Sequence, residues 1–365
     1  MQADERAAAV RAGGAAVSRV ARTAGETHAA ILRMVRTGLR PLGPAGGIPV
    51  GATGLMARAN YGAVAAVAQA AGAIGGPVAA RTAAPDAPPV ADQPGAVPWL
   101  AALGGAFGDH LVGDPDLRPL AVPMALRSGA AALGPADLAD QAPTGTLVLF
   151  VHGLCSHESM WGAGYADTAR RHGGSPVAVR YTTGQPVEDS AAELATLLDS
   201  VVVAWPVPLE RIVLVGHSMG GLVLRAALAL GGAWRGLVTH AVTLGTPHAG
   251  APLERAARAM LALAARHPVT APVGSLGDER SAGIKDLAFG SPAEAAPDVA
   301  WHLVAGVAPG LAPSRLGDGL VTLNSAFDVP AERVARRLRI DGADHLALLD
   351  HPEVADLLGA VVGAT

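Results

Sequence analysis

A serine stands between glycines where one apolar run ends and another begins, in the segment VLVGHSMGGLVL, residues 213–224. Ser218 follows a predicted strand, RIVLVG, and precedes a predicted helix, MGGLVLRAALAL. A tight strand-to-helix turn strains the backbone, and Gly216 and Gly220 have no Cβ atom that would collide with neighbouring segments. Such a turn would present the Ser218 hydroxyl as a nucleophile beside the free N–H groups of the helix. The alternative is a glycine-rich connection with an inert serine, and the flanking strand and helix favour the nucleophile.

Two other glycine-containing segments accompany this turn. His152, Gly153 and Leu154 end an apolar run, and GTPHAG, residues 245–250, follows the run LVTHAVTL. Together with GHSMGG, these motifs resemble the α/β-hydrolase superfamily, and more narrowly the bacterial lipases and esterases of the HGL type. The resemblance covers about residues 145–360 and leaves residues 1–140 unmatched. It implies an α/β-hydrolase fold and serine ester hydrolysis, which needs no cofactor. Some relatives bind calcium, but the sequence has no convincing carboxylate cluster, so no metal is expected.

The resemblance also implies an oxyanion hole. An ester carbonyl gains negative charge when a serine attacks it, and two preorganised N–H groups stabilise that charge. The family pattern assigns these backbone N–H groups to Met219, which follows the nucleophile, and to Leu154, on the loop after the HG strand. His152 and Gly153 are then candidates to line the substrate pocket. Cys155 is expected to pack as a small residue, because a nucleophilic cysteine needs its own base and positive surroundings.

In the α/β-hydrolase fold the catalytic acid and then the histidine follow the serine along the chain. Asp318 lies between glycines in RLGDGLVTLNSA, which matches the family's GDGxV segment. His345 lies just past the predicted strand VARRLRI and before a helical C-terminal segment. We expect His345 to accept the Ser218 proton and return it to the leaving alcohol, while Asp318 orients the imidazole ring.

Other titratable residues are alternatives for these roles. Asp286, in GIKDLAFG, is the second choice for the acid and Asp344 the third. His351 is late enough in the chain but lies inside the last helical pattern. His248, in GTPHAG, precedes every suitable acid, which favours a structural role. The histidines nearest to the motifs in sequence are also expected to make structural hydrogen bonds: His152, His157 and His217.

The pattern of apolar runs predicts the elements that carry these residues. Helical periodicity separates most of the runs, and SAAE at residues 190–193 predicts a capping box that opens one helix. A short additional strand is expected near residues 120–126. The alternation predicts an α/β fold, a mostly parallel sheet with helices on both faces. The apolar run at residues 147–152 is typical of a strand buried on both faces. Further main strands are expected at residues 176–181, 211–216, 237–245, 301–307 and 334–340.

Composition divides the chain into three parts. Residues 1–80 are rich in alanine and predict a helical extension, and residues 81–98 are rich in proline and alanine, which predicts a linker or loop. Residues 99–365 are expected to form the catalytic domain. Within it, residues 252–296 are expected to form a cap or lid, whose apolar helical face would present Met260 and Leu261 to an acyl chain. An ordinary helix packed on the core is the open alternative.

Charge and hydropathy restrict the partners. The formal net charge is −4 and no Lys/Arg-rich run occurs, which argues against a nucleic-acid partner. The single cysteine excludes an intramolecular disulfide framework. Charges interrupt the first residues, so no signal peptide is evident and a cytoplasmic location is expected. Residues 61–80 are long enough to span a bilayer, but their Ala and Gly residues gain little from lipid. Peripheral membrane contact therefore stays open.

Taken together, these expectations describe a serine carboxylic-ester hydrolase, a lipase or esterase. Its partner would be a small-molecule or lipid ester with an apolar acyl group, cleaved through an acyl-serine intermediate. A thioesterase or an acyltransferase could use the same triad, because the serine turn does not select the acceptor. A hydrolase-fold protein that binds lipid without catalysis is the alternative from another functional class.

Overall fold

The chain divides into two compact units, residues 1–88 and 89–365. The predicted helical extension and linker lie almost wholly outside the described residues, as do Met260 and Leu261 of the predicted lid. The last two residues of the predicted linker belong instead to a helix, α3 (Val97–Gly113). Apart from a few single positions before residue 96, the computed structural model describes these parts of the chain: residues 96–113, 118–128, 131–251, 281–310 and 317–364.

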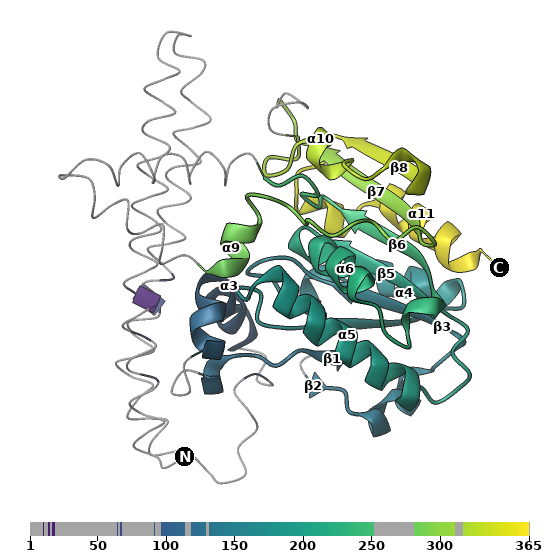
Figure 1. Ribbon diagram of the computed structural model, residues 1–365, viewed down its shortest axis with the longest axis horizontal. Helices are drawn as coiled ribbons and strands as arrows, with labels where there is room; N and C mark the ends of the chain where they lie inside the picture. Colours follow the sequence, from purple (N-terminus) through teal and green to yellow (C-terminus); the bar gives the residue numbers. More distant parts are fainter. Residues whose placement is uncertain are drawn as a thin grey trace. The chain divides into compact units, whose positions relative to one another are not determined.

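In the described part of the second unit, an eight-stranded sheet forms the centre (Figure 1). The order across the sheet is β2-β1-β4-β3-β5-β6-β7-β8. Strand β1 is antiparallel to both of its neighbours, and β3 to β8 are parallel. The mostly parallel sheet is thus confirmed, since β3 to β8 coincide with the six predicted main strands to within a few residues. The strands are β1 (Ala125–Ser128), β2 (Ala131–Ala132), β3 (Thr146–Val151), β4 (Ser175–Arg180), β5 (Arg211–His217), β6 (Val238–Leu244), β7 (Ala300–Val307) and β8 (Val334–Asp341).

The additional strand expected near residues 120–126 begins later, because β1 starts at Ala125. Residues Arg118–Leu120 form a 3₁₀ turn instead. Pro119 and Pro123 have no N–H group to donate to a neighbouring strand, which delays the start of pairing.

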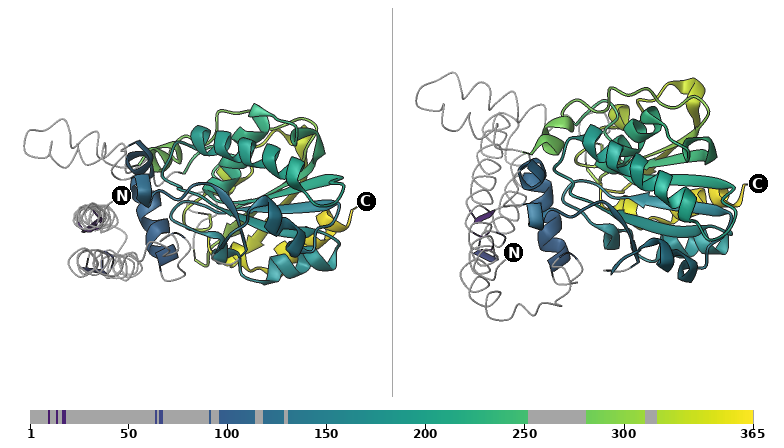
Figure 2. Two further views of the ribbon diagram at one scale, coloured as in Figure 1. Left: turned by 90° about the horizontal axis from the view of Figure 1, so that it is seen from below. Right: turned by 60° about the horizontal axis from the view of Figure 1, so that its bottom comes forward.

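Helices cover both faces of the sheet (Figure 2). Successive residues of a strand point to opposite faces, so Leu214 of β5 joins the apolar cluster under α5 and α6, whereas Val213 joins the cluster under α4 and α11. No helix in the described part of the chain is both long and apolar enough to cross a lipid bilayer. Besides α3, the helices are α4 (Gly164–Arg171), α5 (Val187–Ala204), α6 (Met219–Leu230), α9 (Ala282–Asp286), α10 (Leu323–Ala326) and α11 (Pro352–Gly363).

Helix α5 begins three residues before the predicted capping box. The N–H group of Val187, its first residue, donates to the Asp286 carboxylate (2.8 Å). Ser190 is fully buried inside the first turns of the helix and cannot act as the N-cap. The capping-box prediction is wrong because a residue far along the chain supplies the hydrogen bond that a local cap would otherwise make.

The parallel strands bring the sequence motifs to one edge of the sheet. The segment after β3, residues 152–155 (the HGL loop), leaves the sheet at the same edge as the turn after β5 and GTPHAG after β6. The segments that carry Asp318 and His345 follow β7 and β8 at this edge. The carboxyl ends of strands in open parallel sheets are where such folds place their ligands.

Replacing Leu214 with alanine should lower the free energy of unfolding by about 2–5 kcal/mol, because truncation leaves a cavity in the middle of a buried central strand. The matched control is Leu230→Ala at the end of α6, where the side chain is 61% exposed. That substitution should change the free energy by about 0.5 kcal/mol or less. Urea unfolding followed by circular dichroism measures both, and equal losses would contradict this description of the core.

Candidate active site

Ser218 forms the turn between β5 and α6 in a strained backbone conformation. Its φ is +54° and its ψ is −124°, a combination that residues with a Cβ atom rarely adopt. The Ser218 N–H group donates to the Leu244 carbonyl at the end of β6 (2.8 Å). The Gly221 N–H group donates back to the Ser218 carbonyl (3.1 Å). These bonds hold the strained turn at the carboxyl edge of the sheet.

Glycines let the neighbouring backbone close around this turn. A Cβ atom at Gly220 would collide with the Val151 carbonyl at the end of β3. One at Gly216 would lie 2.7 Å from the Gly221 nitrogen. The first turn of α6 therefore packs directly against β3 and β5, and this close approach is the steric role that the motif spacing predicts.

The HGL loop passes beside Ser218. A Cβ atom at Gly153 would lie only 2.8 Å from the Ser218 Cβ atom. The Ser156 N–H group donates to the Gly153 carbonyl (3.3 Å) and closes a turn whose second residue is Leu154. This bond does not use the Leu154 N–H group. Met219 is the first residue of α6, so its N–H group has no partner within the helix.

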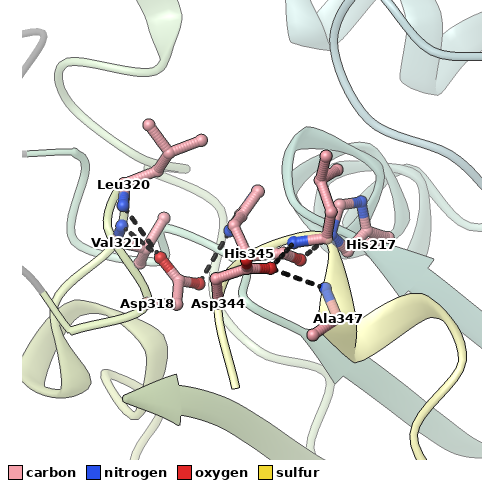
Figure 3. Close-up of polar contacts among 8 residues, drawn as sticks. His217, Asp318, Leu320, Val321, Asp344, His345 and Ala347 are labelled. Atoms are coloured by element: carbon pink, nitrogen blue, oxygen red, sulfur yellow. Dashed lines mark hydrogen bonds and ion pairs between the residues drawn. The ribbon is translucent and has the colours of Figure 1, made fainter. Parts of the chain in front are cut away.

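Asp318 and His345 form a buried hydrogen-bonded pair (Figure 3). Asp318 Oδ2 lies 2.7 Å from His345 Nδ1. The other carboxylate oxygen, Oδ1, accepts hydrogen bonds from the N–H groups of Leu320 (2.9 Å) and Val321 (2.8 Å). The His345 N–H group also donates to the Asp318 carbonyl (3.0 Å). Asp318 is only 2% exposed, so these bonds fix its carboxylate away from bulk solvent.

The His345 ring lies against the serine turn. The rings of His217 and His345 have their centroids 4.7 Å apart, and His217 Nε2 donates to the His345 carbonyl (3.0 Å). On another side, a Cβ atom at Gly245 would lie 2.9 Å from Asp318 Oδ2 and 3.0 Å from His345 Nδ1. The pair therefore contacts both GTPHAG and the residue that precedes Ser218.

The two alternative acids are engaged elsewhere. Asp286 caps α5 through Val187. Asp344 accepts hydrogen bonds from the N–H groups of Leu346 (3.1 Å) and Ala347 (2.8 Å), so it shapes the turn after His345 (Figure 3).

The other histidines make local contacts. His351 accepts a hydrogen bond from the Glu353 N–H group at the start of α11 (3.3 Å). His248 Nε2 lies 3.2 Å from the Thr243 hydroxyl. Burial lowers the pKa of His217 and of His248 to about 3 and the pKa of His152 to about 4, so these three rings are neutral at pH 7.

Cys155 packs against α3. A Cβ atom at Gly105 would collide with the Cys155 Sγ atom, so the thiol lies close to that glycine. The residue as a whole is nevertheless exposed, which differs from the expectation of a packed residue. Desolvation raises the pKa of the thiol to about 11, which keeps it protonated at neutral pH.

The sequence did not reveal two side chains that form hydrogen bonds with the backbone of the HGL loop. The Tyr181 hydroxyl donates to the His152 carbonyl (2.9 Å), and the Thr183 hydroxyl accepts a hydrogen bond from the Cys155 N–H group (3.0 Å). No motif marks these residues: Tyr181 ends a predicted strand and Thr183 follows it. Gly245 could have been found, since it opens GTPHAG. Among the residues that the structure describes, no group of three or more His, Cys, Asp or Glu residues is placed to hold a metal ion.

Comparisons with known proteins give partial matches. A model of the PGAP1-like alpha/beta domain matches residues 183–265. Curated protein sequences give no match. The mature form of the Bacillus licheniformis lipase BlEst2 is 22% identical, with a TM-score of 0.46 over 60% of this chain and 92% of that one. The Pyrococcus furiosus esterase PF2001 is 17% identical, with a TM-score of 0.38 over 60% of this chain and 81% of that one.

The fold follows from the sheet and from the order of the motifs. The sheet is mostly parallel and has an antiparallel strand near one edge. A strained serine lies between β5 and α6, and Asp318 and His345 lie on segments after β7 and β8. This arrangement is that of the α/β-hydrolase fold. The PGAP1-like match covers the serine turn. The chain has the α/β-hydrolase fold.

The strain at position 218 can be measured without reference to activity. Ser218→Gly should have a free energy of unfolding about 1 kcal/mol higher than Ser218→Ala, because only alanine keeps the Cβ atom in the unfavourable conformation. Both variants lack the hydroxyl, so the difference isolates the backbone. Urea unfolding gives the values, and an alanine variant as stable as the glycine variant would show that the turn is unstrained.

Stability should also fall with acid before carboxylates titrate. The folded pKa values of His152, His217 and His248 lie below the ordinary 6.5, so the unfolded chain binds protons first as the pH falls. The contribution is complete above about pH 6.5 and is lost as the pH falls toward the folded values. Between about pH 7.5 and pH 5.5 each of these rings lowers the free energy of unfolding by at most about 1.4 kcal/mol. Urea unfolding at both pH values should show that the free energy of unfolding falls less for His248→Gln than for the wild type. An equal fall in both proteins would refute the buried neutral ring.

Proposed function

We propose that the protein is a serine carboxylic-ester hydrolase of the HGL lipase and esterase type. The observation that supports this most is the buried Asp318–His345 pair beside the strained Ser218 turn. Gly153, which precedes Leu154, packs closely against Ser218, and Met219 begins α6 directly after it. We assign the two oxyanion donors to the backbone N–H groups of Leu154 and Met219 on the family pattern. A nucleophile, a base with its orienting acid and two oxyanion donors are the parts that acyl transfer requires.

In the proposed acylation step, Ser218 Oγ attacks the ester carbonyl while His345 Nε2 accepts the hydroxyl proton. Asp318 accepts the hydrogen bond from His345 Nδ1, which leaves the Nε2 lone pair free and stabilises the imidazolium. The Leu154 and Met219 N–H groups stabilise the negative oxygen of the tetrahedral intermediate. The carbon–oxygen bond to the alcohol then breaks, and His345 Nε2 gives its proton to the leaving alcohol.

In the proposed deacylation step, water attacks the acyl-serine carbonyl and His345 Nε2 accepts a proton from that water. The second tetrahedral intermediate breaks its bond to Ser218 Oγ, which takes the proton back from His345. The carboxylic acid leaves and the serine hydroxyl is restored. The two steps together consume only the ester and one water molecule.

Exposed apolar side chains support an apolar substrate. Leu320 is 49% exposed and lies two residues after Asp318. Leu346 is 58% exposed and follows His345 directly. Apolar surface beside the polar catalytic groups suits an acyl or alcohol group that gains by leaving water.

Ser218→Ala and His345→Ala should each reduce ester turnover by a factor on the order of a million, because the triad acts as a unit. A fluorophosphonate should add one adduct to the wild-type protein and none to Ser218→Ala, as read by intact mass. His351→Ala is the matched histidine control and should keep turnover within about tenfold of wild type, since its ring caps α11.

The same assay separates the alternatives. Nitrophenyl esters of increasing chain length, matched thioesters and an added alcohol acceptor distinguish an esterase, a thioesterase and an acyltransferase. A folded wild-type protein that takes no adduct would refute the proposal and favour a lipid-binding protein without catalysis. An adduct on folded Ser218→Ala would show that another residue is the nucleophile.

A further inference from the structure

The loop between β4 and α5, residues 181–186, forms hydrogen bonds with both ends of the HGL loop. The Tyr181 hydroxyl donates to the His152 carbonyl (2.9 Å), and the two rings stack with centroids 4.7 Å apart. The Thr183 hydroxyl accepts the Cys155 N–H group (3.0 Å). Leu154 therefore lies between two residues that are each fixed from the same neighbouring loop.

One of these hydrogen bonds holds a strained residue in its conformation. Cys155 has a φ of +55°, in the left-handed region that residues with side chains rarely adopt. Relaxation of Cys155 to a negative φ would rotate the peptide that joins it to Leu154. The hydrogen bond to the Thr183 hydroxyl opposes that rotation, since it fixes the direction of the Cys155 N–H group.

The loop of residues 181–186 is itself hydrogen-bonded to three neighbouring segments. The Thr182 hydroxyl accepts a hydrogen bond from the N–H group of Val122, just before β1 (2.7 Å). The Gly184 N–H group donates to the Gly104 carbonyl of α3 (2.8 Å), and the Gly283 N–H group of α9 donates to the Gly184 carbonyl (3.0 Å). Helices α3 and α9 lie side by side (Figures 1 and 2).

The two side chains that contact the HGL loop are buried. Tyr181 and Thr183 are both almost fully buried. Burial raises the pKa of the Tyr181 hydroxyl above its ordinary value, so it stays protonated and continues to donate. Both side chains contact the loop backbone at His152 and Cys155, the residues that flank Gly153 and Leu154.

We propose that Thr183 and Tyr181 are positioning residues for the oxyanion hole, which hold the Leu154 N–H group in place relative to Ser218. This inference rests on the proposed ester-hydrolase function. An oxyanion donor acts on the charge that develops in the transition state, so its displacement lowers kcat and leaves substrate binding nearly unchanged.

The test compares Thr183→Val with Thr183→Ser in the full chain. Valine keeps the shape but removes the acceptor, and kcat for a nitrophenyl ester should fall by about tenfold or more, up to the hundredfold typical of a lost donor. KM should stay within about twofold, and serine should restore kcat to within about threefold of wild type. A boronic acid that forms a tetrahedral adduct with the serine should lose affinity by the same factor as kcat.

Two further variants complete the test. Thr196→Val, on α5 where the hydroxyl only bonds the Ala192 carbonyl, is the control and should leave kcat and KM unchanged. Tyr181→Phe keeps the stacked ring and removes one hydrogen bond, so it should lower kcat several-fold with KM unchanged. If Thr183→Val does not fold, Tyr181→Phe alone decides, and a kcat equal to wild type then overturns the inference.

The outcomes separate this inference from the proposed function. Active wild-type protein with kcat unchanged in folded Thr183→Val and Tyr181→Phe refutes the positioning role alone. Equal changes in kcat and KM that serine does not restore also refute it, because a merely structural role predicts them. A folded wild-type protein with no turnover and no fluorophosphonate adduct refutes the function, and the positioning role falls with it.

Discussion

The contact between Asp318 and His345 is the interaction on which the site depends. Its two atoms lie 2.7 Å apart in a place that solvent hardly reaches. A buried carboxylate is costly unless hydrogen bonds satisfy it, and the N–H groups of Leu320 and Val321 do so on the other oxygen. The two partners come from segments after adjacent parallel strands, so the register of β7 and β8 sets their meeting.

Rigid packing sustains a second constraint, the strained turn at Ser218. The turn is tied to β6 through the Leu244 carbonyl, and Gly220 lets the first turn of α6 press against β3. A close-packed core resists relaxation, so it can keep a residue in a backbone conformation that the residue would leave in isolation. The same principle extends to Cys155, whose left-handed backbone is held through the Thr183 hydroxyl.

Much of the fold and of the candidate site could be predicted from sequence because the signals are local. The run LVLFV is typical of a buried strand. The resemblance to the α/β-hydrolase superfamily supplied the order of Ser218, Asp318 and His345, which lie at or after strand ends. The start of α5 could not be predicted, since Asp286 caps it from far along the chain. Tyr181 and Thr183 escaped for the same reason: nothing beside them in sequence shows which loop they will contact.

The most direct test of the account is the turnover number of Asp318→Asn. Asparagine keeps the size of the side chain but favours the wrong imidazole tautomer, so kcat for ester hydrolysis should fall by about ten-thousandfold in a protein that stays folded. Asp286→Asn, which only weakens the start of α5, should leave kcat near that of wild type. A folded Asp318→Asn variant with kcat within about tenfold of wild type would contradict the role of the Asp318–His345 pair.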